Sequence, residues 1–424
     1  MRSLSSEIQS FTYREKLFIV FSMICGFSIS AEYAITRPAS HALFLEHFSS
    51  SSIPWLWMAT VPVNLFAIYL YNRFLPQWGA LKMWAVASCS VILVNFLAGS
   101  VLSVFPEYIF LQCIWKDIYI LLMFKQLWSM IHSTISPARA KYVYGLIFAM
   151  GTVGSCVGSC VPSLMAVSIG SETLFFFTAP IYLILLVAYT KALSKGGMTK
   201  ESLKKGLMIN PSAGEGVTLI SKNRFLFAIL LLVVAMQVSA GFMEYRFNVY
   251  LEMHILDKDL RTAYCGQLFG LTNALSMAFQ AVGSFLMIHW IGLRRTHFLI
   301  PFLLLASAIC SFAIPSFALI SFSYVFLKAI DFSLFSVGRE MLYIPFGLDE
   351  KFRAKAVIDV FAYRSSKALV SLSILCLQAV AGFYLLEIAS YVSIAVFIAW
   401  ILVVFFMLKH ESYAKQPRAP RLKT

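Results

Sequence analysis

The stretch REMLYIPFGLDEKFRAKAVIDVFAYRSSK, residues 339–367, carries ten charged side chains in a chain of which only 13% is charged and 60% is hydrophobic. Its triplet RAK, residues 353–355, also occurs 214 residues earlier, as RAK at residues 139–141. A motif that recurs at a fixed spacing is typical of a chain built from two similar halves. The internal repeat therefore predicts the fold.

The repeat extends beyond this triplet. The other matched pairs, at spacings of 209 to 214 residues, are Asp117 with Asp331, Lys125 with Arg339, Gly79 with Gly292 and Arg37 with Arg246. Small drifts in spacing are what single-residue changes in loop length produce. Two parallel six-helix repeats describe the major facilitator architecture, whose substrate site lies near the middle of the membrane between the halves.

Apolar segments long enough to cross a membrane fill most of the chain, and its mean hydropathy is +0.79. A helix needs about 20 apolar residues to cross roughly 30 Å of hydrocarbon. Twelve such spans are predicted, at residues 17–46, 53–74, 81–104, 107–131, 142–167, 172–193, 225–251, 263–290, 296–314, 316–338, 356–383 and 386–408. Runs of this length give helices and not barrel strands. We expect an all-α integral membrane protein with about twelve transmembrane helices in two six-helix pseudo-repeats.

The predicted organisation follows from these spans and from the basic segments between them. It comprises a first half at 1–193, a basic linker at 194–224, a second half at 225–408 and a basic tail at 409–424. Lys and Arg gather in every second loop, and the outside loops hold only Lys258 and Arg261, which predicts that both termini are cytoplasmic. We expect a bacterial inner membrane. The net charge of +14 reflects this topology and does not indicate nucleic-acid binding.

The spacings of cysteine, histidine and glycine argue against several kinds of site and assembly. All eight cysteines fall inside predicted spans without CxxC pairs or His-rich metal spacing, so neither disulfides nor a metal or cofactor is expected. No nucleophile with a base is apparent, which argues against an enzyme. Gly151, Gly154 and Gly158 are expected to allow close helix packing within the bundle, and the functional unit is expected to be a monomer.

Charged residues inside the membrane are functional candidates because each is costly to bury. In SAEYAITRPASHA, residues 30–42, Tyr33, Arg37 and His41 share one helix face. At the corresponding positions of the seventh span stand Phe242, Arg246 and Tyr250. Arginine offers a fork suited to phosphate or carboxylate, and rings can stack on a base. These six residues are predicted to bind an anionic substrate, and for His41 the alternative is a core histidine with satisfied hydrogen bonds.

Two carboxylates lie in the same layer of the membrane. Glu32 and Glu244 are expected to serve as acceptors or as proton-linked groups. The alternative is that they pair with Arg246 and Arg37 and lock the halves together.

The fourth and tenth spans carry further charges. They are Lys116, Asp117 and Lys125 in the fourth, and Lys328, Asp331, Arg339 and Glu340 in the tenth. Lys125 and Arg339 lie eight residues beyond the aspartates, about 12 Å closer to the cytoplasm, and are predicted to form an inner cationic vestibule that contacts the substrate. Lys328 can pair with Asp331, and the two aspartates either neutralise cations or take part in transport.

The quoted stretch resembles a known family. REMLYIP (339–345) and KFRAKAVIDVFAYRSSK (351–367) are similar to the signature of the ATP/ADP nucleotide transporters of plastids and obligate intracellular bacteria. ITRPASHAL (35–43) and IWKDIYILLMF (114–124) resemble further segments of that family. The resemblance implies a carrier in the lipid bilayer that moves a nucleotide by alternating access, as exchange or as proton-coupled symport. It also implies that Asp359, Arg364 and Lys367 form an ion-pair network at an inner gate.

The chain departs from the family pattern at three positions. Ser40 and His41 stand where the family has Lys followed by Asp, and Cys113 replaces an acidic residue. A cation lost near the substrate phosphates changes which ligand charge is balanced. The alternative is therefore a major facilitator-type carrier of a different anionic metabolite.

Overall fold

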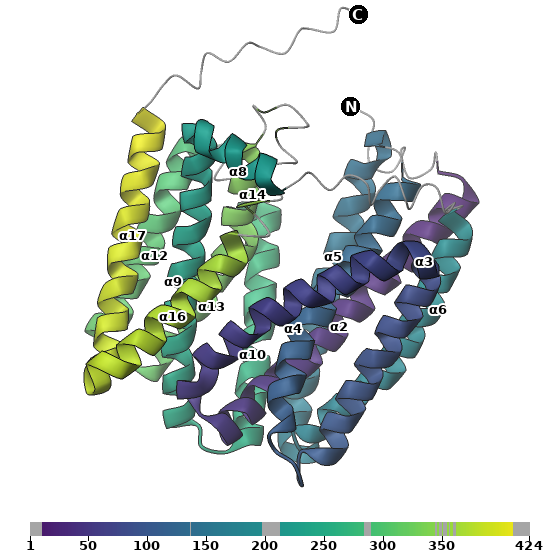
Figure 1. Cartoon of the computed structure of the whole chain (residues 1–424), viewed down its shortest axis with the longest axis horizontal. Helices are drawn as coiled ribbons and strands as arrows, with labels where there is room; N and C mark the ends of the chain where they lie inside the picture. Colours follow the sequence, from purple (N-terminus) through teal and green to yellow (C-terminus); the bar gives the residue numbers. More distant parts are fainter. Residues whose placement is uncertain are drawn as a thin grey trace, which may run out of the picture. The chain divides into compact units, whose positions relative to one another are not determined.

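The computed structural model describes residues 11–135, 137–196, 213–283, 290–343 and 362–409, together with residues 346, 350, 354, 355, 357 and 358. Every regular element within these residues is a helix, so the predicted all-α class is confirmed (Figure 1). The chain divides into two compact units. One comprises Met1–Asn210 and Leu251–Ala274, and the other Pro211–Tyr250 and Leu275–Thr424.

The first unit is built around its N-terminal helix. Its elements are α2 (Tyr13–Phe48), η1 (Ser50–Ser52), α3 (Ile53–Val101), α4 (Tyr108–Thr134), α5 (Pro137–Ile169), η2 (Glu172–Phe177), α6 (Thr178–Gly196) and most of α10 (Lys258–Ala278). A capping box between Thr12 and Glu15 starts α2. This helix packs against α4, α5 and α6 (Figure 1). In the core, Trp84 stacks on Tyr189 with ring centroids 3.9 Å apart.

The second unit contains the remaining helices. They are α8 (Ala213–Lys222), α9 (Arg224–His254, up to Tyr250), η3 (Phe279–Gly283), α12 (Leu293–Ala313), α13 (Phe317–Ile330), η5 (Asp331–Phe335), α14 (Ser336–Leu342), α16 (Tyr363–Ala381), η7 (Gly382–Tyr384) and α17 (Leu385–Lys409). α12 packs against α13 and α17 (Figure 1). The core of the second unit includes the fully buried Ile229, Met236 and Trp400.

Two glycines matched in the sequence repeat share one backbone conformation. Gly79 has φ 76° and ψ 167° and interrupts α3 between the predicted spans 53–74 and 81–104. Gly292 has φ 86° and ψ 150° and precedes α12. Only glycine adopts this region of φ and ψ without strain. The same local requirement at both positions explains why glycine occurs at equivalent points of the two halves.

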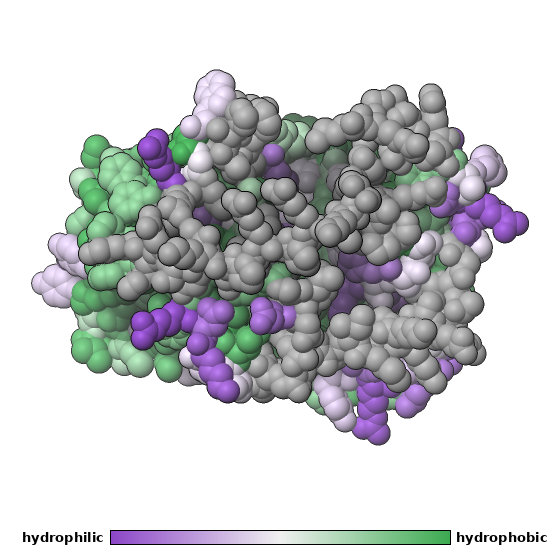
Figure 2. Space-filling model, turned by 90° about the horizontal axis from the view of Figure 1, so that it is seen from above, coloured by the Kyte–Doolittle hydropathy of each residue, from purple (hydrophilic) through white to green (hydrophobic). Residues whose placement is uncertain are grey.

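The helices have the length and composition of membrane spans. Eight helices in the described part of the chain are long and apolar enough to cross a membrane, and α3, counted once, holds two of the predicted spans. Large apolar side chains such as Leu65, Phe66, Phe405 and Phe406 are exposed. Figure 2 shows apolar surface, in green, along the flank of the molecule. A surface of this kind suits hydrocarbon and not water, so the chain is an integral membrane protein.

Small residues bring α5 close to α2. A Cβ atom built on Gly154 would lie 2.4 Å from the carbonyl oxygen of Phe27, and one on Gly158 would lie 2.3 Å from that of Ala31. The predicted role of these glycines in packing within the bundle is thereby confirmed for Gly154 and Gly158. This close approach also fixes α2 at the turn that carries Glu32.

We expect Gly158→Ala to destabilise the protein by about 3 kcal/mol, because the added methyl group meets backbone atoms that cannot rotate away. Gly145→Ala, on the same helix, is the matched control, since a Cβ there meets nothing within 4 Å. Thermal unfolding of both variants in detergent measures the difference. Equal melting temperatures for the two variants would contradict the expected clash.

Candidate substrate site

Arg37 of α2 lies between aromatic rings in the first unit. Its guanidinium carbon is 4.1 Å from the centroid of the Phe269 ring and 5.9 Å from that of Tyr33. Lys116 of α4 is 5.9 Å from the same Tyr33 ring and forms an ion pair with Asp117 at 3.4 Å. The structure thus brings together four of the residues singled out in the sequence. Two cations within electrostatic reach of each other make this cluster attractive to an anion.

His41 lies one turn further along the same face of α2. Its Nδ1 is 3.7 Å from the Sγ of Cys265 in α10. Cys265 and Phe269 are four residues apart and therefore share one face of α10. The shared face predicted for Arg37 and His41 is confirmed, because both contact this face of α10. Sequence analysis missed Phe269 and Cys265, since neither is charged.

Glu32 is fully buried in a network of neutral donors. Its Oε1 accepts hydrogen bonds from Tyr119 at 2.9 Å, Thr178 at 3.0 Å and Asn95 at 3.2 Å. Gln112 in turn donates to Asn95 Oδ1 at 3.1 Å. These partners come from α3, α4 and α6, so the carboxyl group joins four helices of the first unit. Sequence analysis did not single out these partners; polar residues inside apolar spans, Asn95 and Gln112 among them, would have been the signal.

The two main departures from the family pattern lie in contact. Cys113 Sγ donates to the carbonyl oxygen of Ser40 at 3.5 Å, and both residues are buried. The resemblance places a lysine at the first position and an acidic residue at the second, so the two opposite charges of the family pattern would lie on neighbouring turns of α2 and α4. Their joint replacement therefore removes one charge of each sign. With His41 in place of the family's Asp as well, the three departures together remove one positive and two negative charges, so the loss of the cation is accompanied by a loss of negative charge.

Restoring only one of these charges should destabilise the chain. We expect Ser40→Lys or Cys113→Glu alone to cost about 3 kcal/mol, because each would bury an unpaired charge. The double variant should recover at least about 1 kcal/mol relative to the sum of the single effects. Thermal unfolding of all four proteins completes the double-mutant cycle. Strictly additive losses would contradict the contact as the site of a family ion pair.

Lys125 lies two turns beyond Asp117 on α4. Its Nζ donates to Asn72 Oδ1 at 2.7 Å and lies 5.2 Å from the centroid of the Tyr71 ring. The ammonium group is therefore anchored to α3 and is separate from the cluster around Arg37.

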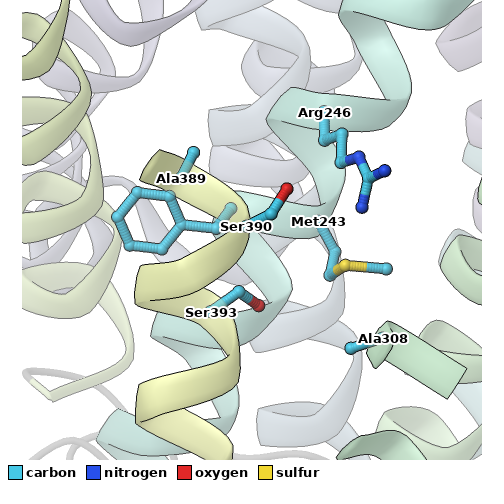
Figure 3. Close-up of a pocket in the computed structure, with 7 residues that line it drawn as sticks. Met243, Arg246, Ala308, Ala389, Ser390 and Ser393 are labelled. Carbon is cyan, nitrogen blue, oxygen red and sulfur yellow. The ribbon is translucent and has the colours of Figure 1, made fainter. Parts of the chain in front are cut away.

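Arg246 of α9 occupies the corresponding place in the second unit. Its Nη2 donates to the carbonyl oxygen of Ser311 at 2.8 Å, and its guanidinium carbon is 5.8 Å from the Tyr250 ring centroid. With Phe242, Met243, Ser390 and others it borders a cavity of about 10 Å³ between α9, α12 and α17, toward which the α17 serines turn (Figure 3). Ligand pockets for drug-sized molecules measure about 300–1,000 Å³, so in this structure the space beside Arg246 is far smaller than a nucleotide pocket, and the predicted contact of Arg246 with substrate stays a prediction.

Three further charged candidates of the second unit have partners within it. Lys328 forms an ion pair with Glu244 at 2.9 Å and lies 5.8 Å from the Tyr324 ring centroid. Asp331, at the start of the π-helical η5, accepts from Gln237 at 3.4 Å. The carboxylate of Glu244 is therefore compensated by a lysine, unlike that of Glu32.

Part of the stretch at residues 339–367 belongs to the described residues. The Arg339 guanidinium carbon is 5.9 Å from the Phe335 ring centroid. Glu340 forms an ion pair with Lys355, the last residue of the repeated triplet, at 2.6 Å. Lys367 is half-buried on α16, whereas Asp359 and the side chain of Arg364 lie outside the described residues. The gate predicted for this stretch stays a prediction.

A polar cluster closes one end of the first unit. Ser171, between α5 and η2, donates from its hydroxyl to Asp259 Oδ1 at 2.5 Å and lies 2.7 Å, Oγ to Oγ1, from Thr262 of α10. Glu172 forms an ion pair with Lys258, and Arg261 lies 3.4 Å from Glu46. All of these positions belong to loop ends that the charge pattern places outside. Their convergence places these loop ends together at one end of the first unit, and the side of the membrane that this end faces stays a prediction.

Comparison with known proteins agrees with these features. Residues 318–411 match the TLC ATP/ADP transporter family. The matched segment contains the stretch in which the resemblance was found, so the predicted recognition is confirmed. No curated protein sequence matches the chain.

Solved structures with similar folds include three transporters. A point mutant of the nucleoside transporter NupG is 12% identical, with a TM-score of 0.68 over 92% of this chain and 99% of NupG. The POT family transporter PepTSo is 12% identical, with a TM-score of 0.63 over 96% of this chain and 100% of its own. A bacterial homologue of the iron transporter ferroportin is also 12% identical, with a TM-score of 0.59 over 94% and 100%. At this identity the likeness shows the fold alone. The predicted fold of a membrane transporter is confirmed.

Proposed function

We propose that the chain carries a nucleotide across the bacterial inner membrane by alternating access, as a monomer with both termini in the cytoplasm. The observation that carries this proposal is the Arg37 cluster. A guanidinium fork held on the Phe269 ring, with Lys116 close by, offers charge for phosphate groups and aromatic surface for a base. The TLC family match supports the same substrate class.

The chain acts as a carrier and not as an enzyme in this proposal. Binding at the cluster would favour closure of the halves around the anion, and release would follow when they open on the other side. A second candidate is a carrier of a different anionic metabolite. The neutral contact between Ser40 and Cys113 favours it, because the family places two charges there.

Uptake by proteoliposomes tests the proposal. The purified full-length chain is given radiolabelled ATP, ADP, GTP and AMP, with and without nucleotide inside the vesicles. Saturable uptake that unlabelled nucleotides compete away is the expected result. Absence of uptake across the panel by folded protein would overturn the nucleotide proposal and direct the search to other organic anions.

A further inference from the structure

Glu32 is a buried carboxyl group surrounded by neutral polar side chains of the first unit. It is completely buried, and its hydrogen-bond partners Tyr119, Thr178 and Asn95 are neutral. Among the described residues no cation lies within ion-pair distance of it, in contrast to Glu244 with Lys328. A buried carboxylate without a paired cation is costly, so a change of its protonation state is a natural way to lower that cost.

The hydroxyl groups around Glu32 can satisfy either protonation state. In the ionised state Tyr119 donates to the carboxylate, whose Oε2 is 3.0 Å away. In the protonated state Oε2–H donates to the Tyr119 oxygen. Tyr119 then donates to Thr36 Oγ1 at 3.2 Å, and Thr36 donates to the carbonyl oxygen of Glu32, also at 3.2 Å.

Only hydroxyl rotations separate these two arrangements. The bonds from Asn95 and Thr178 to Oε1 stay in place, so no heavy atom has to move. A carboxyl group that only holds helices together needs hydrogen-bond partners for one protonation state. This network supplies a full set of partners for both states.

The network is linked to the substrate cluster. Lys116 lies three residues before Tyr119 on α4 and interacts electrostatically with Glu32. The other ionisable groups facing Glu32 are Tyr119 itself and Tyr182 of α6. From α3 it meets Asn95, and from α5 Gly158 faces the neighbouring Ala31. Protonation of Glu32 would remove one of the negative charges that attract Lys116, which stays paired with Asp117, and would make the field around the cluster more favourable to a substrate anion.

We infer that Glu32 binds and releases the proton that is coupled to substrate movement, with Tyr119 and Thr36 as the hydroxyl chain that accommodates both states. This inference rests on the proposed function and decides between its two modes, in favour of proton-coupled symport.

Glu32→Gln tests the inference in proteoliposomes. A glutamine can accept from Asn95 and Thr178 and donate to Tyr119, so it imitates the protonated state and keeps the fold. We expect a pH gradient to lose its ability to drive accumulation, while exchange at equal pH stays within about threefold of the wild type. Glu107→Gln, at an exposed carboxyl group just before α4, is the matched control and should keep gradient-driven accumulation.

A second variant keeps the test decisive if Glu32→Gln does not fold. Tyr119→Phe removes one donor to the carboxylate, so the pH dependence of uptake should move to higher pH by about one unit. An unchanged midpoint in Tyr119→Phe would overturn the inference. So would gradient-driven accumulation in Glu32→Gln, or loss of exchange in the folded variant. If the wild type takes up nucleotide at a rate that does not depend on the pH gradient, the inference about Glu32 is overturned and the proposed function stands. If the wild type takes up no nucleotide, the proposed function is overturned as well.

Discussion

Arg37→Ala is expected to lower nucleotide uptake by about 100-fold, because a charge-assisted bond to an arginine fork contributes on the order of 1.5–3 kcal/mol. The guanidinium group lies on the Phe269 ring, so its loss also removes the surface that positions the anion. Arg37→Lys should recover only part of the activity, since lysine retains the charge but not the fork. Initial rates of uptake in proteoliposomes measure both effects.

Arg14→Ala is the matched control for this experiment. Arg14 is an exposed arginine at the start of the same helix, so its removal should leave uptake unchanged. Equal uptake by Arg37→Ala and Arg14→Ala, in protein that unfolds at the same temperature, would exclude the Arg37 cluster as the substrate site.

Cross-linking Ser171 to Thr262 is expected to stop transport. Their hydroxyl oxygens are 2.7 Å apart, so the sulfur atoms of two cysteines at these positions are expected to come within reach of each other. Thr262 belongs to the second half of the sequence, yet this part of α10 lies in the first compact unit. If the halves separate here during alternating access, a covalent bond at this point prevents the opening.

The double variant Ser171→Cys/Thr262→Cys should therefore transport when reduced and lose uptake to background when oxidised. Each single cysteine variant is a control for the effect of the oxidant on the eight native cysteines. Mass spectrometry of the peptide pair confirms the bond. A fully cross-linked protein that still transports would show that this cluster stays closed throughout the cycle.

Much of the fold follows from local sequence patterns. Each predicted span overlaps a helix, because about 20 apolar residues in succession have only one way to satisfy their backbone in hydrocarbon. Gly79 and Gly292 were recognisable as repeat partners by their spacing, and the structure gives the reason for the match, since both have a positive φ. The face shared by Arg37 and His41 follows from spacing along one helix.

Other features depend on which helices meet. The contact of Cys113 with Ser40 joins residues that the sequence separates by 73 positions. The two departures from the family pattern therefore have to be considered as a pair. The partners of Lys328 and the rings around Arg37 are likewise set by packing between helices. No periodicity within one segment encodes such pairs, because helix packing permits several rotations of each neighbour.

By itself, the sequence determined that this chain is a helical membrane transporter with repeated halves, a family signature at residues 339–367 and charged residues at membrane depth. The tertiary structure decided what those charges contact. It places Glu244 beside a lysine and Glu32 among neutral hydroxyl and amide groups. The two carboxylates hold similar places in the sequence pattern. Their chemistry differs because a buried charge is defined by its neighbours, and only the packed bundle supplies them.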